Sequence, residues 1–162
     1  MYWKSPKDGQ CCECRPHVCD PCDACPTAET IELTVSGVSS CCRPNNSRLN
    51  GLGSINGAHT LTRQESGEYT LEIASAVWVD WFEEPDCESL LTSDETRDVS
   101  MSFSCTAESA VLDIRLSDSG VRLFYEEITP PGAGELFVFL GGEGCSVLTP
   151  YTFGGTASIA ST

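Results

Sequence analysis

The sequence predicts an all-β protein, an antiparallel β-sandwich of jelly-roll type with about eight short strands. Three observations predict it: apolar and polar residues alternate along most of the chain, turn residues recur at short intervals, and no segment has the spacing of an amphipathic helix. A chain of 162 residues, 40% of them hydrophobic, suffices for one domain with a core. We therefore divide the chain into a cysteine-rich, irregular arm, residues 1–28, and a β-sandwich domain, residues 29–162.

The first strands of this domain follow from simple alternation. Apolar residues at Ile31, Leu33 and Val35 alternate with polar ones and predict a half-buried strand. A turn-rich loop is expected over residues 39–57, and a hairpin after it, with strands at 60–62 and 69–73. Further strands are expected at residues 77–82, 99–105, 112–116, 121–125, 135–140 and 147–159.

Two of these later strands have features of their own. Residues 77–82 are apolar on much of both faces, and Pro85 ends that strand. Residues 99–105 alternate cleanly between apolar residues and serines, so we interpret Cys105 as a small core residue. The Ser117–Gly120 turn joins the next two strands as a hairpin.

The arm contains six of the eleven cysteines within fifteen residues and almost no apolar side chains. Such a segment buries too little surface to offset its ordering entropy, so bonds to sulfur must hold it. The Cys-x-x-Cys spacings suit a tetrahedral zinc site, and disulfides remain the open alternative. The expected zinc ligands are Cys11, Cys14, Cys19, Cys22, Cys25 and His17.

The other cysteines are candidates for disulfides or for a second metal site. Cys87 and Cys145 each follow a turn at a strand end, where such a pair would cross-link two loops. The full set of these candidates is Cys12, Cys41, Cys42, Cys87 and Cys145.

The net charge and the first ten residues limit which partners and which cellular compartment are expected. With 24 acidic and 9 basic residues the formal net charge is −15, which repels phosphate backbones and anionic membrane surfaces. We expect no nucleic-acid partner and no membrane insertion. The first ten residues lack the apolar stretch of a signal peptide, so synthesis in the cytoplasm is expected.

No set of catalytic residues stands out from the background. The sequence has two histidines, His17 and His59, and neither a zinc-protease nor a nucleophile-elbow motif. We therefore expect a protein that is not an enzyme. Trp78 and Trp81, followed closely by acidic residues, form a candidate ligand platform for sugars, and this leaves a carbohydrate-active enzyme as an alternative.

Short motifs spread along the chain resemble those of one loose group of proteins. They are the Cys-Cys-x-Cys opening of the arm, residues 35–38, Asn56-Gly57 before His59, and the late Gly144-Cys145 pair. Together they resemble small cysteine-rich, all-β proteins encoded by tailed bacteriophages and planctomycete-like genomes. The resemblance implies a virion-associated or surface-displayed role.

These observations together predict a structural or interaction protein. We expect an accessory component of a tailed-phage virion, such as a capsid decoration, fibre or tail protein, that works as a homo-oligomer beside capsid or tail proteins. Edge strands and the arm are the expected contacts. A zinc-stabilised module that binds a protein or a glycan is the first alternative.

Overall fold

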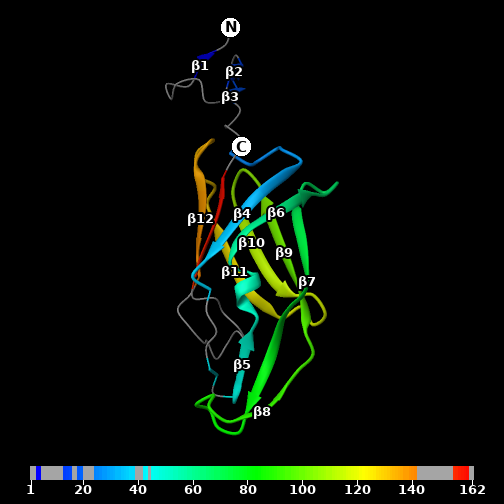
Figure 1. Cartoon of the computed structure of the whole chain (residues 1–162). Coiled ribbons are helices and arrows are strands. Elements are labelled where there is room, and N and C mark those ends of the chain that lie inside the picture. The colour runs from blue at the N-terminus through cyan, green and yellow to red at the C-terminus, as the bar shows by residue number, and fades with distance from the viewer. Residues whose placement is uncertain are drawn as a thin grey trace.

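The computed structural model describes residues 3–4, 13–15, 18–19, 24–38, 42–43, 45–141 and 155–160, the first three ranges by their backbone only. It is built almost entirely from antiparallel strands (Figure 1). The main body is a ten-stranded sheet with eight strands on its hydrogen-bonded path, in the order β11-β10-β9-β7-β6-β4-β13-β12. Their bounds are β4 Thr30–Ser36, β6 Gly57–Arg63, β7 Tyr69–Phe82, β9 Arg97–Cys105, β10 Ala110–Leu116, β11 Arg122–Ile128, β12 Leu136–Leu140 and β13 Thr156–Ala160.

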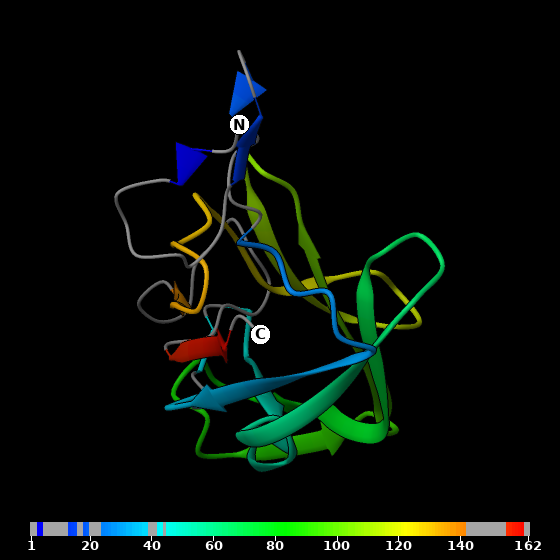
Figure 2. The ribbon, with the colours of Figure 1, turned by 90° about the horizontal axis from the view of Figure 1, so that it is seen from above.

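The predicted all-β, antiparallel class is confirmed, and the topology is an up-and-down meander. Each of these strands pairs with the next one along the path, and β13 returns to pair with β4. The strands curve around a common interior, seen from above in Figure 2. At the seam between β11 and β12 the two strands approach each other, but no ladder joins them. The body is therefore a nearly closed, flattened barrel.

The core lies between the two layers of this flattened barrel. Inward residues alternate with outward ones, as in β4, where Ile31, Leu33 and Val35 are buried between exposed neighbours. Phe103 of β9 contacts Phe137 and Phe139 of β12, which lies on the other side of the interior. Because aromatic side chains from opposite sides of the barrel contact each other, the interior is filled with packed side chains, as in a β-sandwich.

The long strand β7 belongs to two parts of the sheet. Its first half pairs with β6 and β9, and its second half pairs with β5 (Ser47–Asn50) and β8 (Leu90–Ser93). Between the halves the register shifts, and Ser75 has a φ of 51° with its N–H bonded to the carboxylate of Asp98. This bulge redirects β7 into a three-stranded extension at the lower end of Figure 1.

The extension was not predicted from the sequence. The expected loop over 39–57 contains β5 and a short 3₁₀ helix, Leu52–Ser54, and β8 follows the acidic loop 83–89. The two strands expected at 69–73 and 77–82 are one continuous strand. Of the last expected strand, 147–159, the described part begins at Gly155.

The arm contains more regular backbone than expected. Three short strands, β1 (Trp3–Lys4), β2 (Glu13–Arg15) and β3 (Val18–Cys19), form a sheet of their own in which Cys14 lies opposite Cys19. The expectation of an irregular arm is therefore wrong for these residues. In the part of the chain described here, no helix is long and apolar enough to cross a membrane.

Candidate functional site

The root of the arm is bonded covalently to the barrel. Cys25, five residues before β4, forms a disulfide with Cys105, the last residue of β9, across 80 residues of sequence. The Sγ atom of Cys25 also lies 3.2 Å from the carbonyl oxygen of Thr106. In the chain-entropy model, closing a loop of this length stabilises the folded state by about 4.5 kcal/mol. The disulfide therefore fixes where the arm leaves the barrel.

Tyr69 provides a second attachment at the same place. Its side chain is fully buried at the start of β7, and its hydroxyl lies 2.6 Å from the carbonyl oxygen of Ala28 and 3.1 Å from that of Pro26. Burial raises the pKa of the Tyr69 phenol, and the nearby Arg63 guanidinium partly offsets that rise. The phenol thus stays protonated and donates to the segment that leads out of the arm.

A cavity of about 490 Å³ opens beside this attachment. The disulfide of Cys25 and Cys105 lies in its wall, next to Tyr69, and its charged lining residues among those described are Arg63 and Glu68. One cation and one anion do not select for either charge of ligand, so the cavity by itself identifies no substrate.

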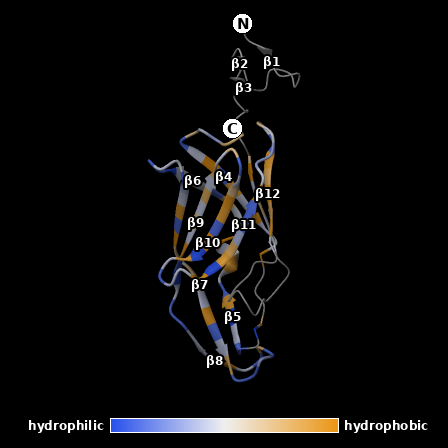
Figure 3. Ribbon diagram, turned by 180° about the vertical axis from the view of Figure 1, so that it is seen from behind, coloured by the Kyte–Doolittle hydropathy of each residue, from blue (hydrophilic) through white to orange (hydrophobic). Residues whose placement is uncertain are grey.

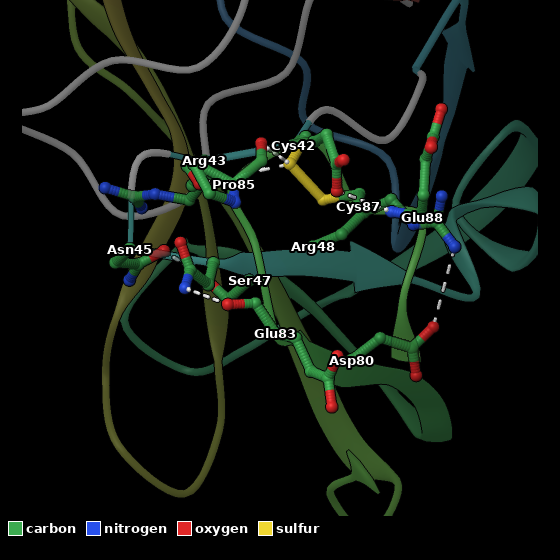
Figure 4. The surroundings of a disulfide bond; sticks show 12 residues. Cys42, Arg43, Asn45, Ser47, Arg48, Asp80, Glu83, Pro85, Cys87 and Glu88 are labelled. Atoms are coloured by element: carbon green, nitrogen blue, oxygen red, sulfur yellow. Dashed lines mark hydrogen bonds and ion pairs between the residues drawn. A yellow bond between two sulfur atoms is a disulfide. The ribbon is translucent and has the colours of Figure 1, made fainter. Parts of the chain in front are cut away.

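A second disulfide closes the far end of the extension (Figure 4). Cys42, which forms an isolated bridge with Arg48 of β5, is bonded to Cys87 in the acidic loop between β7 and β8. The loop is also held by Asn46, whose carbonyl oxygen accepts from Phe82 N–H and whose side-chain amide donates to the Glu83 carbonyl. This disulfide therefore fixes the acidic loop against the end of β5.

Asp80 organises the interior of the extension. Its carboxylate is buried and accepts hydrogen bonds from Trp78 Nε1 at 3.1 Å, from Ser93 Oγ at 2.5 Å and from the side-chain amide of Asn50. Arg48 adds an ion pair at 3.7 Å. Partners from all three strands thus converge on one carboxylate, which is how a buried charge is held without a large penalty.

Gly51 allows the extension to close over this carboxylate. It follows β5 with a φ of 81°, and a Cβ there would lie 2.5 Å from the Ala76 carbonyl oxygen and 2.8 Å from the Trp78 ring. Only glycine fits both the backbone conformation and the space. From the sequence, this glycine was expected only as part of the turn-rich loop over residues 39–57.

The two predicted platform residues do not form an open aromatic surface. Trp78 is half-buried and its ring N–H is bonded to Asp80, while Trp81 is half-buried and packs against the core. Asp80, the first acidic residue beside them, lies between strands and is held by hydrogen bonds. The tryptophans and this acid therefore act together in packing the extension.

The structure corrects three interpretations of the cysteines. Cys25 is wrong as a zinc ligand, because its sulfur is bonded to Cys105. Cys105, expected as a small core residue, does pack against the core, but it is half of this disulfide. Cys87 pairs with Cys42 and not with Cys145, because the hairpin of β7 and β8 brings its loop to the residues before β5.

The rest of the predicted zinc site lies outside the described side chains and stays a prediction. It comprises Cys11, Cys14, Cys19, Cys22 and His17, and the same holds for Cys12, Cys41 and Cys145 among the disulfide candidates. Where side chains are described, no three His, Cys, Asp or Glu residues gather as metal ligands.

Comparison of the chain with protein-family models, with curated proteins and with solved structures finds no match.

Proposed function

We propose that this protein is a non-enzymatic structural protein of an assembled particle, an accessory component of a tailed-phage virion. The observation that carries the proposal is the covalent link between the arm root and the barrel at Cys25 and Cys105. A fixed exit point lets the arm hold the barrel in a set orientation on a larger body. An arm that attaches the protein to a larger body needs such a fixed exit point, whereas a solvent-exposed tail does not.

The chemistry of the extension supports the same proposal. Its buried acid, Asp80, accepts hydrogen bonds from Asn50, Trp78 and Ser93, so its carboxylate is engaged in holding the three strands together and not presented to a substrate. Disulfides at both ends of the molecule, Cys25–Cys105 and Cys42–Cys87, suit a protein that persists outside the reducing cytoplasm, as a released virion component does. With a net charge of −15, its partners in the particle are proteins and not the packaged nucleic acid.

The proposal is tested by locating the chain in particles. Lysates of the producing culture are fractionated on a density gradient, and the particle band is washed in high salt and analysed by peptide mass spectrometry. We expect the chain in the washed band at a fixed ratio to the major capsid protein, and oxidised on non-reducing gels. Recovery of the chain only from the particle-free fractions contradicts the proposal.

A matched pair of variants tests the role of the arm root. Replacing both Cys25 and Cys105 with Ser should reduce incorporation into particles, while replacing both Cys42 and Cys87 with Ser, far from the arm, should leave it unchanged. Equal incorporation of all three proteins removes the arm root from the proposal.

A further inference from the structure

Strand β12 ends the described sheet path and has an apolar outer face. It pairs with β13 on one side. On its other side β11 approaches without forming a ladder, so no described strand is hydrogen-bonded there. Phe137 and Phe139 point inward and are fully buried. The outward residues Leu136, Val138 and Leu140 are 53%, 45% and 63% exposed, and β12 is apolar along its length in Figure 3.

An edge of this kind is usually protected. Soluble proteins place lysine, proline or a bulge on free edge strands, because unpaired N–H and C=O groups next to apolar side chains recruit another strand. β12 has none of these devices among its five residues, Leu-Phe-Val-Phe-Leu. In a chain with a net charge of −15, an uncharged exposed edge is the place where a second negative molecule meets the least repulsion.

The backbone of β12 is oriented for further pairing. Gly141 N–H donates to the carbonyl oxygen of Gly155 directly opposite, so this is a hydrogen-bonded pair of the antiparallel ladder between β12 and β13. Such pairs alternate along a ladder, so Phe139 and Phe137 are bonded to β13 in the same way. The N–H and C=O groups of Leu136, Val138 and Leu140 therefore face the side of β12 to which no described strand is bonded.

The sequence of β12 reads the same in both directions, which makes it complementary to itself. We propose that β12 pairs with β12 of a second copy of this chain, antiparallel and around a two-fold axis at Val138. Each Leu136 then lies beside Leu140 of the other copy, the two Val138 side chains lie side by side, and about six backbone hydrogen bonds form. A two-fold interface must match a surface to itself, and a palindromic strand does so residue by residue.

The charges next to β12 agree with this register. Glu135 lies opposite Gly141 of the second copy, so no acid meets an acid. The Glu135 carboxylate is turned back onto its own loop, where it accepts from Gly132 N–H at 2.8 Å. No ion pair is needed across the interface, so salt should strengthen the dimer by screening the repulsion between two negative molecules. An interface built on ion pairs would weaken.

This inference names one partner of the proposed assembly protein and rests on that proposal only for its biological use. The full chain is studied by light scattering coupled to size exclusion over a range of concentrations, at low and high salt. We expect a monomer–dimer equilibrium that shifts toward dimer in high salt. Amide hydrogen exchange of residues 136–140 should slow as the protein concentration rises, a readout that needs no variant.

Variants at the two-fold position sharpen the test. Val138→Lys should weaken the dimer at least about tenfold, because two like charges then meet at the axis. The matched control is Leu91→Lys on β8, where Leu91 is 60% exposed on another uncharged edge strand, and this variant should dimerise as the wild type does. Mixing the Val138→Lys and Val138→Asp variants should restore a dimer, which also shows that both proteins are folded.

Three results would overturn the proposal. They are a monomer at every concentration and salt, a dimer that survives Val138→Lys, and a dimer that Leu91→Lys breaks. An oligomer that forms through another surface refutes the β12 interface and leaves the particle role standing. Absence of the chain from particles refutes that role whatever β12 does.

Discussion

The ring centroid of Phe103 on β9 lies 5.3 Å from that of Phe137 on β12, with the two ring planes at 75°. This edge-to-face contact joins strands that lie far apart on the sheet path and meet only through the interior. Phe139 adds a similar contact with Phe103 at 6.2 Å. The aromatic cluster therefore holds the two layers of the flattened barrel together and fixes β12 in place, although among the described strands β12 pairs only with β13.

Truncation of this cluster should destabilise the whole barrel. Phe137→Ala removes a fully buried ring and leaves a cavity between the layers, so we expect the free energy of unfolding to fall by about 3–5 kcal/mol. Leu91→Ala, at a residue 60% exposed, is the control and should change it by less than about 0.5 kcal/mol. Urea unfolding followed by tryptophan fluorescence measures both. Equal midpoints for the two variants would show that the interior is not packed as described.

The disulfides, and not a metal, should determine the stability of the barrel. Replacing Cys42 and Cys87 with Ser should lower the free energy of unfolding by about 2–4 kcal/mol, because a link across 45 residues is lost. Reduction of the wild type should lower its melting temperature, whereas a chelator should leave the main transition unchanged. Calorimetry of the oxidised, reduced and chelator-treated protein measures this. A main transition that shifts with the chelator would place a metal in the barrel's fold.

Asp80 should be among the most sensitive polar positions of the molecule. Asp80→Ala leaves the Trp78 ring N–H, the Ser93 hydroxyl and the Asn50 amide without their common acceptor, so we expect a loss of about 3–5 kcal/mol. Ser93→Ala removes one donor from the edge of the same network and should cost about 1 kcal/mol. Thermal unfolding of the two variants beside the wild type gives the comparison. A cost for Asp80→Ala no larger than that for Ser93→Ala would mean that the carboxylate does not organise the extension.

Alternation along the chain was enough to predict the barrel strands, because each has one face in the core and one face in solvent. It missed β5 and β8, which are four residues long and lie in the extension, where packing against β7 and the Cys42–Cys87 disulfide stabilise them. Alternation also did not predict the bulge at Ser75, because the residues before and after Ser75 in the sequence are apolar.

The site was predictable only in part, for a related reason. A cysteine in the sequence indicates that a covalent link can form, but its partner depends on which strand ends the topology brings together. Cys25 was therefore assigned to a metal, and the disulfide of Cys105 was missed although its packing against the core was predicted. Asp80 was interpreted as one of several acids beside a tryptophan, because nothing local distinguishes a buried acid from a solvated one. Nothing in the sequence indicated that Tyr69 anchors the arm root, because its hydroxyl binds backbone carbonyl groups that lie more than 40 positions earlier in the chain, at Pro26 and Ala28.

Tyr69 should make the arm root sensitive to alkaline pH. Burial raises the pKa of its phenol in the folded state, so the folded protein keeps a proton that the unfolded chain releases near pH 10. The contribution of Tyr69 to stability is therefore fully present below the unfolded pKa and is lost as the pH rises through the folded value. Spectrophotometric titration at 295 nm should show one of the four tyrosines ionising later than the others.

The variant Tyr69→Phe separates this titration from the packing of the ring. It keeps the buried ring but removes the hydroxyl that binds the Pro26 and Ala28 carbonyl oxygens, so we expect a loss of about 1 kcal/mol at neutral pH. Its stability should also fall less steeply than that of the wild type above pH 10. Limited proteolysis should cut the variant faster within residues 24–29, because the segment then lacks the Tyr69 hydrogen bonds that help the Cys25–Cys105 disulfide to hold it. Identical cleavage rates and identical alkaline profiles for the two proteins would show that the hydroxyl does not anchor the arm root.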